Sequence, residues 1–166
     1  MKPRIDKAAG ELSSAMKSLQ PGESFSIIAF SHAARRFKKQ LVPADPETIA
    51  QANQWLGQMP LDYGTDLGKA MSQAFSMQGV NVVVLITDGV PTMGEKNFGK
   101  LVSRIRDLNA GRARIDTIGL KGDNPTDEGG DPNQEFEAAG LLRQIARDSG
   151  GESKVVDGDQ LLNGKQ

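Results

Sequence analysis

Two residues with side-chain oxygens, Thr65 and Asp88, stand where the chain is expected to change direction. Thr65 precedes a segment with the apolar spacing of a helix, and Asp88 ends a β-branched run. Hydroxyl and carboxylate oxygens are ligands that hard divalent cations such as Mg²⁺ and Mn²⁺ prefer. If the fold brings the two residues together, they predict part of a metal-centred binding site.

The lengths of the two elements predict that Thr65 and Asp88 meet. A helix over residues 66–77 would be about 18 Å long at ~1.5 Å per residue. A strand over residues 80–87 would be about 25 Å long at ~3.3 Å per residue. A tight turn near Gly79 makes them antiparallel, so the helix start returns to the carboxyl end of the strand, where open α/β sheets bind ligands. The alternative is that Thr65 only caps its helix and Asp88 only stabilises a turn.

Helices and strands alternate along the rest of the chain, which predicts an α/β fold of three layers with helices on both faces of a mostly parallel sheet. The β-branched run is typical of a central parallel strand covered on both faces. Asp45 and Pro46 predict the start of one helix, and Gly111 the C-cap of another. The helices are expected at residues 4–19, 47–57, 66–77, 97–109 and 134–148, and the strands at 25–30, 35–37 (a short antiparallel edge strand), 80–87, 114–120 and 152–156.

The amino-acid composition excludes several classes of function. A chain of 166 residues fits one domain, and 20 basic against 21 acidic residues give no concentrated basic face for nucleic acid. The absence of cysteine excludes thiol chemistry and cysteine-bound zinc, and a single histidine excludes a multi-histidine site. No apolar run is long enough to span a bilayer.

The chain resembles a von Willebrand factor type A domain over nearly all of its length. The resemblance rests on Gly64-Thr65-Asp66-Leu67, on Leu85-Ile86-Thr87-Asp88-Gly89 followed by Pro91-Thr92, on the strand at 114–120, and on the segment from Leu142 to Gly151. It implies a single domain over residues 1–166 with a Rossmann-like fold and a metal-ion-dependent adhesion site.

In that family, the metal ligands come from an Asp-x-Ser-x-Ser motif after the first strand, a threonine in a Gly-Thr loop and an aspartate in a Thr-Asp-Gly loop. Thr65 and Asp88 match the last two, and Asp66 is a weaker candidate that caps the helix or supports the site. The Asp-x-Ser-x-Ser motif has no match in this chain. We therefore expect an incomplete site that does not bind Mg²⁺ or Mn²⁺ tightly.

The same comparison implies that the central first strand is missing, as in an N-terminally truncated domain. Its absence would leave two unpaired strand edges, at residues 25–30 and 80–87. We expect these two strands to pair directly, or a strand from elsewhere in the chain or from a second copy to fill the position. A homodimer through the altered sheet edge is thus one predicted partner.

The resemblance further implies a non-enzymatic protein-interaction or adhesion module. A protein partner would complete the coordination of the metal with an acidic side chain, and the surrounding loops would give specificity. Many relatives are secreted or tethered to membranes, so the compartment is left open. The residues expected to contact the partner are Ser31, His32, Tyr63, Gly64, Gly89, Pro91 and Thr92.

Three alternatives remain. A metal-independent scaffold subunit would use the altered sheet edge to form oligomers. A hydrolase built on Ser31, His32 and Asp88 would lack the Gly-x-Ser-x-Gly turn. The acid-rich loop at 123–131 fails the EF-hand pattern, so a solvated loop is favoured over a calcium site.

Overall fold

The computed structural model describes residues 2–60, 64–88, 90–120 and 132–156. Contacts between residues divide the chain into two compact units. Unit 1 consists of residues Met1–Glu11, Val82–Val90 and Ala113–Gln166, and unit 2 of Leu12–Asn81 and Pro91–Arg112.

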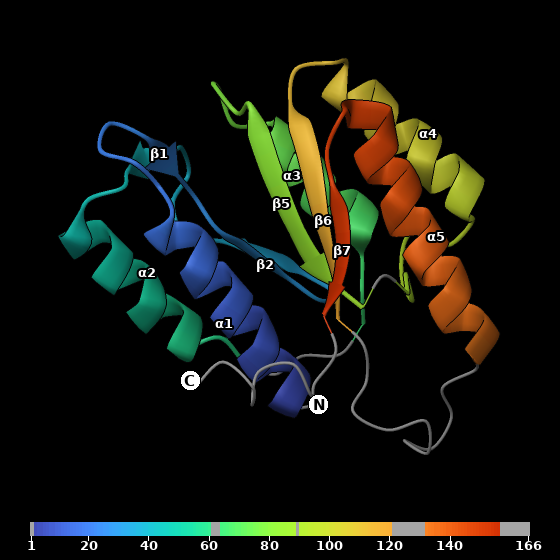
Figure 1. Ribbon diagram of the computed structural model, residues 1–166, viewed down its shortest axis with the longest axis horizontal. Coiled ribbons are helices and arrows are strands. Elements are labelled where there is room, and N and C mark those ends of the chain that lie inside the picture. The colour runs from blue at the N-terminus through green and yellow to red at the C-terminus, as the bar shows by residue number, and fades with distance from the viewer. Residues whose placement is uncertain (1, 61–63, 89, 121–131, 157–166) are drawn as a thin grey trace, which may run out of the picture. The chain divides into compact units, whose positions relative to one another are not determined.

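Unit 1 is built on a parallel sheet of three described strands, in the order β5-β6-β7 (Figure 1). The strands are β5 (Val82–Thr87), β6 (Arg114–Leu120) and β7 (Ser153–Val156). Thr87 of β5 pairs with Gly119, and Leu120 of β6 pairs with Val156. The carboxyl ends of the strands therefore share one edge, and Asp88 follows β5 at that edge.

Helices cover both faces of this sheet. On one face lies α5 (Pro132–Ser149), where the buried Thr117 hydroxyl donates to the Leu142 carbonyl at 3.2 Å. On the other face, Ala8 of α1 (Lys2–Lys17) packs with an apolar cluster, and Lys154 of β7 pairs with Glu11 at 2.6 Å. The cluster consists of Ile86, Ile118, Leu120 and Val156. Unit 1 thus has the predicted α/β/α layering.

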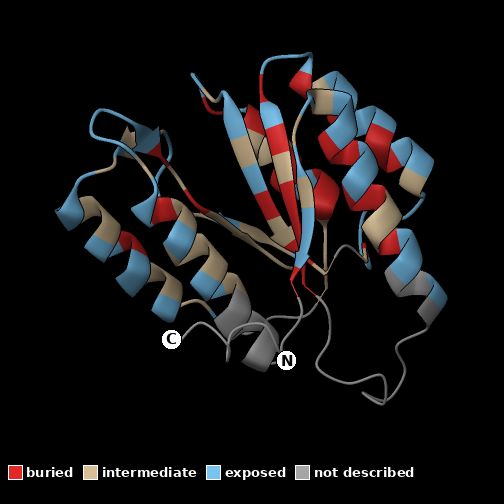
Figure 2. Ribbon diagram, in the orientation of Figure 1, coloured by how far each residue is buried: buried red, intermediate tan, exposed pale blue. Residues whose placement is uncertain are grey.

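The prediction that residues 80–87 form a central strand covered on both faces is wrong. β5 pairs with β6 alone among the described strands, and Val82 and Val84 are 43% and 41% exposed. The central strand is β6, which carries the longest run of buried residues in the sheet (Figure 2). The apolar run of β5 suggested the more buried position, but the more buried strand is β6, although it contains the polar residue Thr117. Thr117 can be buried because its hydroxyl is hydrogen-bonded to Leu142 and Ser153.

The strands of unit 2 form two antiparallel pairs. β2 (Ile28–Phe30) pairs with β3 (Ala34–Arg36), which confirms the short antiparallel strand expected at residues 35–37. β1 (Ser24–Phe25) pairs with β4 (Val42–Pro43), a strand that was not predicted. The single strand expected at residues 25–30 is therefore interrupted at Ser26-Ile27. The expected direct pairing with the strand at 80–87 is not found among the described ladders, in which β2 pairs with β3 and β5 with β6.

Three helices complete unit 2: α2 (Pro46–Gly57), α3 (Leu67–Phe75) and α4 (Phe98–Asn109). α3 packs against α4, β2 and β3. The Asp45 side chain caps α2 as predicted, accepting from the Thr48 amide at 2.7 Å. The C-cap of α4 is not Gly111 but Ala110, which has a left-handed φ of 47°. No helix in the described part of the chain is long and apolar enough to cross a membrane.

Candidate functional site

Three loop segments of unit 2, residues 31–33, 64–66 and 91–94, meet at the start of α3, and we call them the loop cluster. The Asp66 amide donates to the Ser31 carbonyl at 3.0 Å. The Thr65 amide donates to the Thr92 hydroxyl at 2.8 Å, and the Thr92 amide donates back to the Thr65 carbonyl at 3.1 Å. This reciprocal pair fixes the two loops in register, so the cluster is held by its own backbone together with the Thr92 hydroxyl.

Gly64 opens the segment before α3, and two features favour glycine there. Its φ of +89° lies in the left-handed region. A Cβ atom there would also lie 2.6 Å from the Met93 sulfur. Met93, which is 42% exposed, therefore packs directly on the Gly64 backbone while part of its side chain faces solvent.

Asp66 is the N-cap of α3. Its Oδ1 accepts from the Lys69 amide at 3.0 Å, satisfying one of the unpaired amides of the first turn. Gly94 approaches so closely that a Cβ atom there would lie 2.7 Å from this oxygen. Asp66 therefore has the capping role that was one of its two predicted roles, and the alternative in which Thr65 caps the helix is wrong.

The Thr65 hydroxyl makes no hydrogen bond to any residue that the structure describes, although both its backbone groups are used. Thr92 and His32 are exposed, Ser31 is half-buried, and Pro91 is buried. Thr92, rather than Pro91, presents its side chain to solvent.

Asp88 follows β5 in unit 1 and is half-buried. Its Oδ1 accepts from the Val90 amide at 3.3 Å, which closes a turn over two residues. The turn-stabilising role that was one alternative for Asp88 is therefore present. The meeting of Asp88 with Thr65, which belongs to unit 2, stays a prediction.

The predicted ligands are oxygen atoms, which suit a hard cation, but they are too few to fill its coordination shell. Mg²⁺ takes an octahedral shell of oxygens, and Thr65 with Asp88 would supply two. Among the described residues, no group of three or more His, Cys, Asp or Glu side chains is placed to hold a metal ion. Asp66 already uses one oxygen as a helix cap.

Some of the predicted residues lie outside the described part of the chain: Tyr63, Gly89 and the acid-rich loop up to residue 131. Two residues of the loop cluster, Met93 and Gly94, were not singled out from the sequence. The sequence feature that could have pointed to Gly94 is the glycine itself, because it lies within a polar loop and does not end a helix or strand. Its contact with Asp66 depends on a loop far away in the sequence, which local patterns do not show.

Residues 1–154 match the von Willebrand factor type A domain family. Human inter-alpha-trypsin inhibitor heavy chain H4 is 26% identical over 173 aligned residues, which cover 96% of this chain and 17% of that protein. The bovine heavy chain H4 is likewise 26% identical, with 93% and 18% covered. The chain thus spans less than a fifth of the length of these relatives.

Solved structures show the same fold. A von Willebrand factor type A protein from Catenulispora acidiphila superposes with a TM-score of 0.72 at 22% identity, covering 93% of this chain and 34% of that one. The pilus adhesin SpaC from Lactobacillus rhamnosus GG, in its open conformation, gives a TM-score of 0.73 at 12% identity, covering 96% and 26%. At these identities the likeness concerns the fold alone.

Proposed function

Because this chain belongs to the von Willebrand factor type A domain family, we propose that it is a protein-interaction module whose partner docks on the loop cluster. The observation that supports this proposal most is the way the cluster is held. Its three segments are tied to one another by hydrogen bonds of the backbone and of the Thr92 hydroxyl, while Thr65 is half-buried and Thr92 is exposed. Such a preorganised loop surface loses little conformational entropy on binding.

The partner would present an acidic side chain to this surface. A divalent ion held by Thr65 and Asp88 would supply positive charge between the partner's carboxylate and the module. Within the chain, Asp66 would keep α3 and the Gly64-Thr65 turn in place, and Asp88 would hold the backbone after β5. With only two protein ligands, we propose that the site is incomplete and that the ion alone binds weakly.

We further propose that the module is not an enzyme. The sequence contains no Gly-x-Ser-x-Gly turn of the kind that presents a serine nucleophile.

Manganese binding tests the proposal directly. Titration of the chain with Mn²⁺, followed by electron paramagnetic resonance, should give a dissociation constant on the order of 1 mM. Adding acetyl-Gly-Asp-Gly-amide should tighten it, because the peptide carboxylate completes the shell, whereas the Gly-Asn-Gly analogue should not. The variants Thr65→Val and Asp88→Asn should each lose this enhancement, and Asp148→Asn, an exposed aspartate on α5, should keep it.

Micromolar Mn²⁺ binding without peptide would show that the site is complete and overturn the proposed weak site. Equal peptide enhancement in wild type, Thr65→Val and Asp88→Asn would remove both residues from the site.

A second candidate function, a metal-independent scaffold subunit, is favoured by the open edge of β5. Its outer edge has no partner among the described strands, and Val82 and Val84 are more than two-fifths exposed. The strand also lacks the proline, lysine or bulge that usually protects such an edge. A second copy of the chain would then pair along β5.

Sedimentation velocity in EDTA checks this candidate at micromolar concentration. If copies pair through β5, the wild type should form dimers and Val84→Lys should be monomeric, because a lysine on an edge strand opposes pairing. Val155→Lys is the matched control, since Val155 is 42% exposed on β7. A wild type that stays monomeric in EDTA would exclude the scaffold function.

A further inference from the structure

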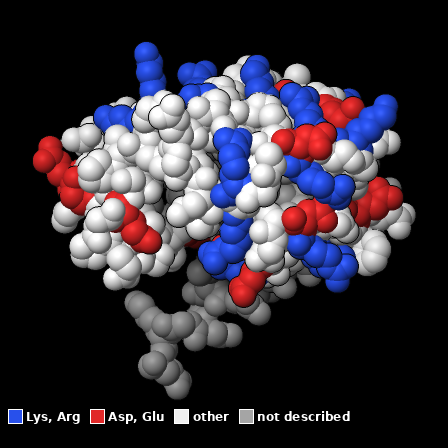
Figure 3. All heavy atoms as spheres, turned by 90° about the horizontal axis from the view of Figure 1, so that it is seen from above, with Lys and Arg blue, Asp and Glu red and all other residues white. Residues whose placement is uncertain are grey.

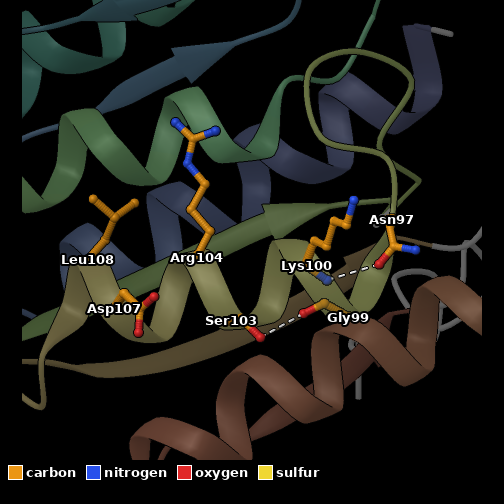
Figure 4. Close-up of a pocket in the computed structure, with 7 residues that line it drawn as sticks. All are labelled: Asn97, Gly99, Lys100, Ser103, Arg104, Asp107 and Leu108. Atoms are coloured by element: carbon orange, nitrogen blue, oxygen red, sulfur yellow. Dashed lines mark hydrogen bonds between the residues drawn. The ribbon is translucent and has the colours of Figure 1, made fainter.

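A hollow of about 740 Å³ lies along α4. Its described lining comes from α4 and from Asn97, the residue that precedes it (Figure 4). Lys100 and Arg104 stand one turn apart and extend to the same side of the helix, while Ser103 and Asp107 lie on the other side. The hollow therefore has a cationic side and a side that ends in one carboxylate.

Most hydrogen-bonding groups of the hollow are already used by the helix itself. Asn97 Oδ1 accepts from the Lys100 amide at 2.9 Å, and the Ser103 hydroxyl donates to the Gly99 carbonyl at 3.0 Å. The two cations are different. Among the described residues, Lys100 and Arg104 make no ion pair, and Arg104 has only a long contact of 3.5 Å to the Ser72 hydroxyl. Both charges are exposed and ready for an external anion.

The charge of the chain is unevenly divided in a way that favours an anionic partner for this surface. Unit 2 carries eleven Lys and Arg against seven Asp and Glu, whereas unit 1 carries nine against fourteen. Unit 2 is thus net positive by four within a chain of net charge −1. Two cations at helical spacing match two carboxylates of a peptide, and Arg104 can bind one of them with two parallel hydrogen bonds.

The size and composition of the hollow favour a peptide over a polyanion. Nucleic acids and anionic membranes need a continuous basic field. Here Asp107 lines the same hollow, and basic and acidic side chains are interspersed on the face drawn in Figure 3. The half-buried Leu108 at the far end, and the missing side chain at Gly99, leave room for an apolar residue and for a close backbone.

We propose that the α4 hollow binds an acidic peptide segment of a partner protein, with two carboxylates on Lys100 and Arg104 and an apolar residue beside Leu108. This binding requires neither a metal ion nor the loop cluster. It therefore adds a second, independent contact surface to the interaction module.

Fluorescence anisotropy in EDTA tests the proposal with a fluorescein-labelled peptide of Glu-Glu-Leu repeats. The chain should bind this probe, and affinity should fall several-fold between about 50 and 300 mM NaCl as screening increases. The double variant Lys100→Glu/Arg104→Glu should weaken binding by at least about tenfold. The control Lys17→Glu/Lys39→Glu makes the same change in net charge at exposed positions of unit 2 and should bind within about twofold of wild type.

Equal losses in the two double variants would mean that net charge alone attracts the probe, and would overturn the site. So would binding of a Gln-Gln-Leu peptide as tight as that of the acidic probe. Binding of phosphatidylserine vesicles but not of the peptide would replace the peptide by a membrane surface. The neutral variant Lys100→Gln/Arg104→Gln, with its circular dichroism compared to wild type, separates lost binding from lost folding. Because EDTA is present throughout, failure here leaves the metal-dependent proposal untouched.

Discussion

At the scale of single residues, the loop cluster depends on close backbone approach more than on charged groups. Gly64 admits the Met93 side chain, and Gly94 admits the Asp66 carboxylate that caps α3. Both glycines have positive φ values, of 89° and 66°. Side chains at either position would push apart loops that the hydrogen bonds between Thr65 and Thr92 hold together.

Substitution of Gly94 by alanine should therefore destabilise the fold by more than the strain of a left-handed alanine alone. Gly94→Ala would place Cβ 2.7 Å from Asp66 Oδ1, whereas at Gly111 (φ +71°) nothing lies within 4 Å. We expect Gly94→Ala to lower the free energy of unfolding by about 2–3 kcal/mol and Gly111→Ala by about 1 kcal/mol. Urea denaturation measures both. Equal losses would mean that the loop absorbs the added methyl group without displacing Asp66.

At the scale of elements, the ends of the helices are set by specific caps. Asp45, Asp66 and Asn97 each accept from the amide three residues on, at the starts of α2, α3 and α4. At the other end of α4, Ala110 adopts a left-handed conformation, which at helix ends is most often adopted by glycine. The helix thus ends at an alanine in a conformation that alanine disfavours, because the chain must turn towards β6 through Gly111.

The cap of α2 should make stability depend on pH in a predictable direction. The backbone hydrogen bond from Thr48, assisted by its side chain, lowers the pKa of Asp45 below its usual value of 3.8. Its contribution is therefore complete above about pH 5 and is lost as pH falls through 3.8 and then through the folded-state pKa. The stability difference between wild type and Asp45→Asn should be constant from about pH 5 to 7 and shift against the wild type below that range. Thermal unfolding across this range measures it, and a difference that does not change with pH would contradict the ionised cap.

The left-handed end of α4 predicts a stabilising substitution. Ala110→Gly should raise the free energy of unfolding by about 1 kcal/mol, because glycine adopts this conformation without the steric cost. Ala50→Gly, at an exposed position inside α2, should lower it by about the same amount. Chemical denaturation of the two variants should thus show opposite signs. Destabilisation by both would mean that the loss of backbone entropy outweighs the relief at residue 110.

At the scale of the whole molecule, the described sheets do not form one continuous ladder. β6 is paired on both sides, β5 and β7 on one side each, and the strands of unit 2 form separate antiparallel pairs. The outer edge of β5 is therefore the feature most sensitive to self-association. In a monomer its outward N–H and C=O groups face solvent, and in a dimer paired through β5 they are hydrogen-bonded.

Hydrogen exchange should report this difference strand by strand. In dilute solution, we expect all β6 amides to be protected, and β5 to alternate between protected amides that point to β6 and exchanging amides that point outward. Raising the concentration should protect the outward amides of β5 only if copies pair there. Val84→Lys should abolish that concentration dependence. Uniform protection along β5 in a sample shown to be monomeric would contradict its open edge.

The sequence by itself determined the α/β class, the family, the capping of α2 by Asp45 and the bounds of β6, which match the predicted strand at residues 114–120. These features depend on local periodicity, on cap chemistry and on short motifs. Only the tertiary structure decided that β6 rather than β5 is central, that Asp66 rather than Thr65 caps α3, and that Gly94 lies against that cap. Each of these depends on contacts between residues far apart in the chain, where a buried polar group such as Thr117 is acceptable because a distant partner satisfies its hydrogen bonds.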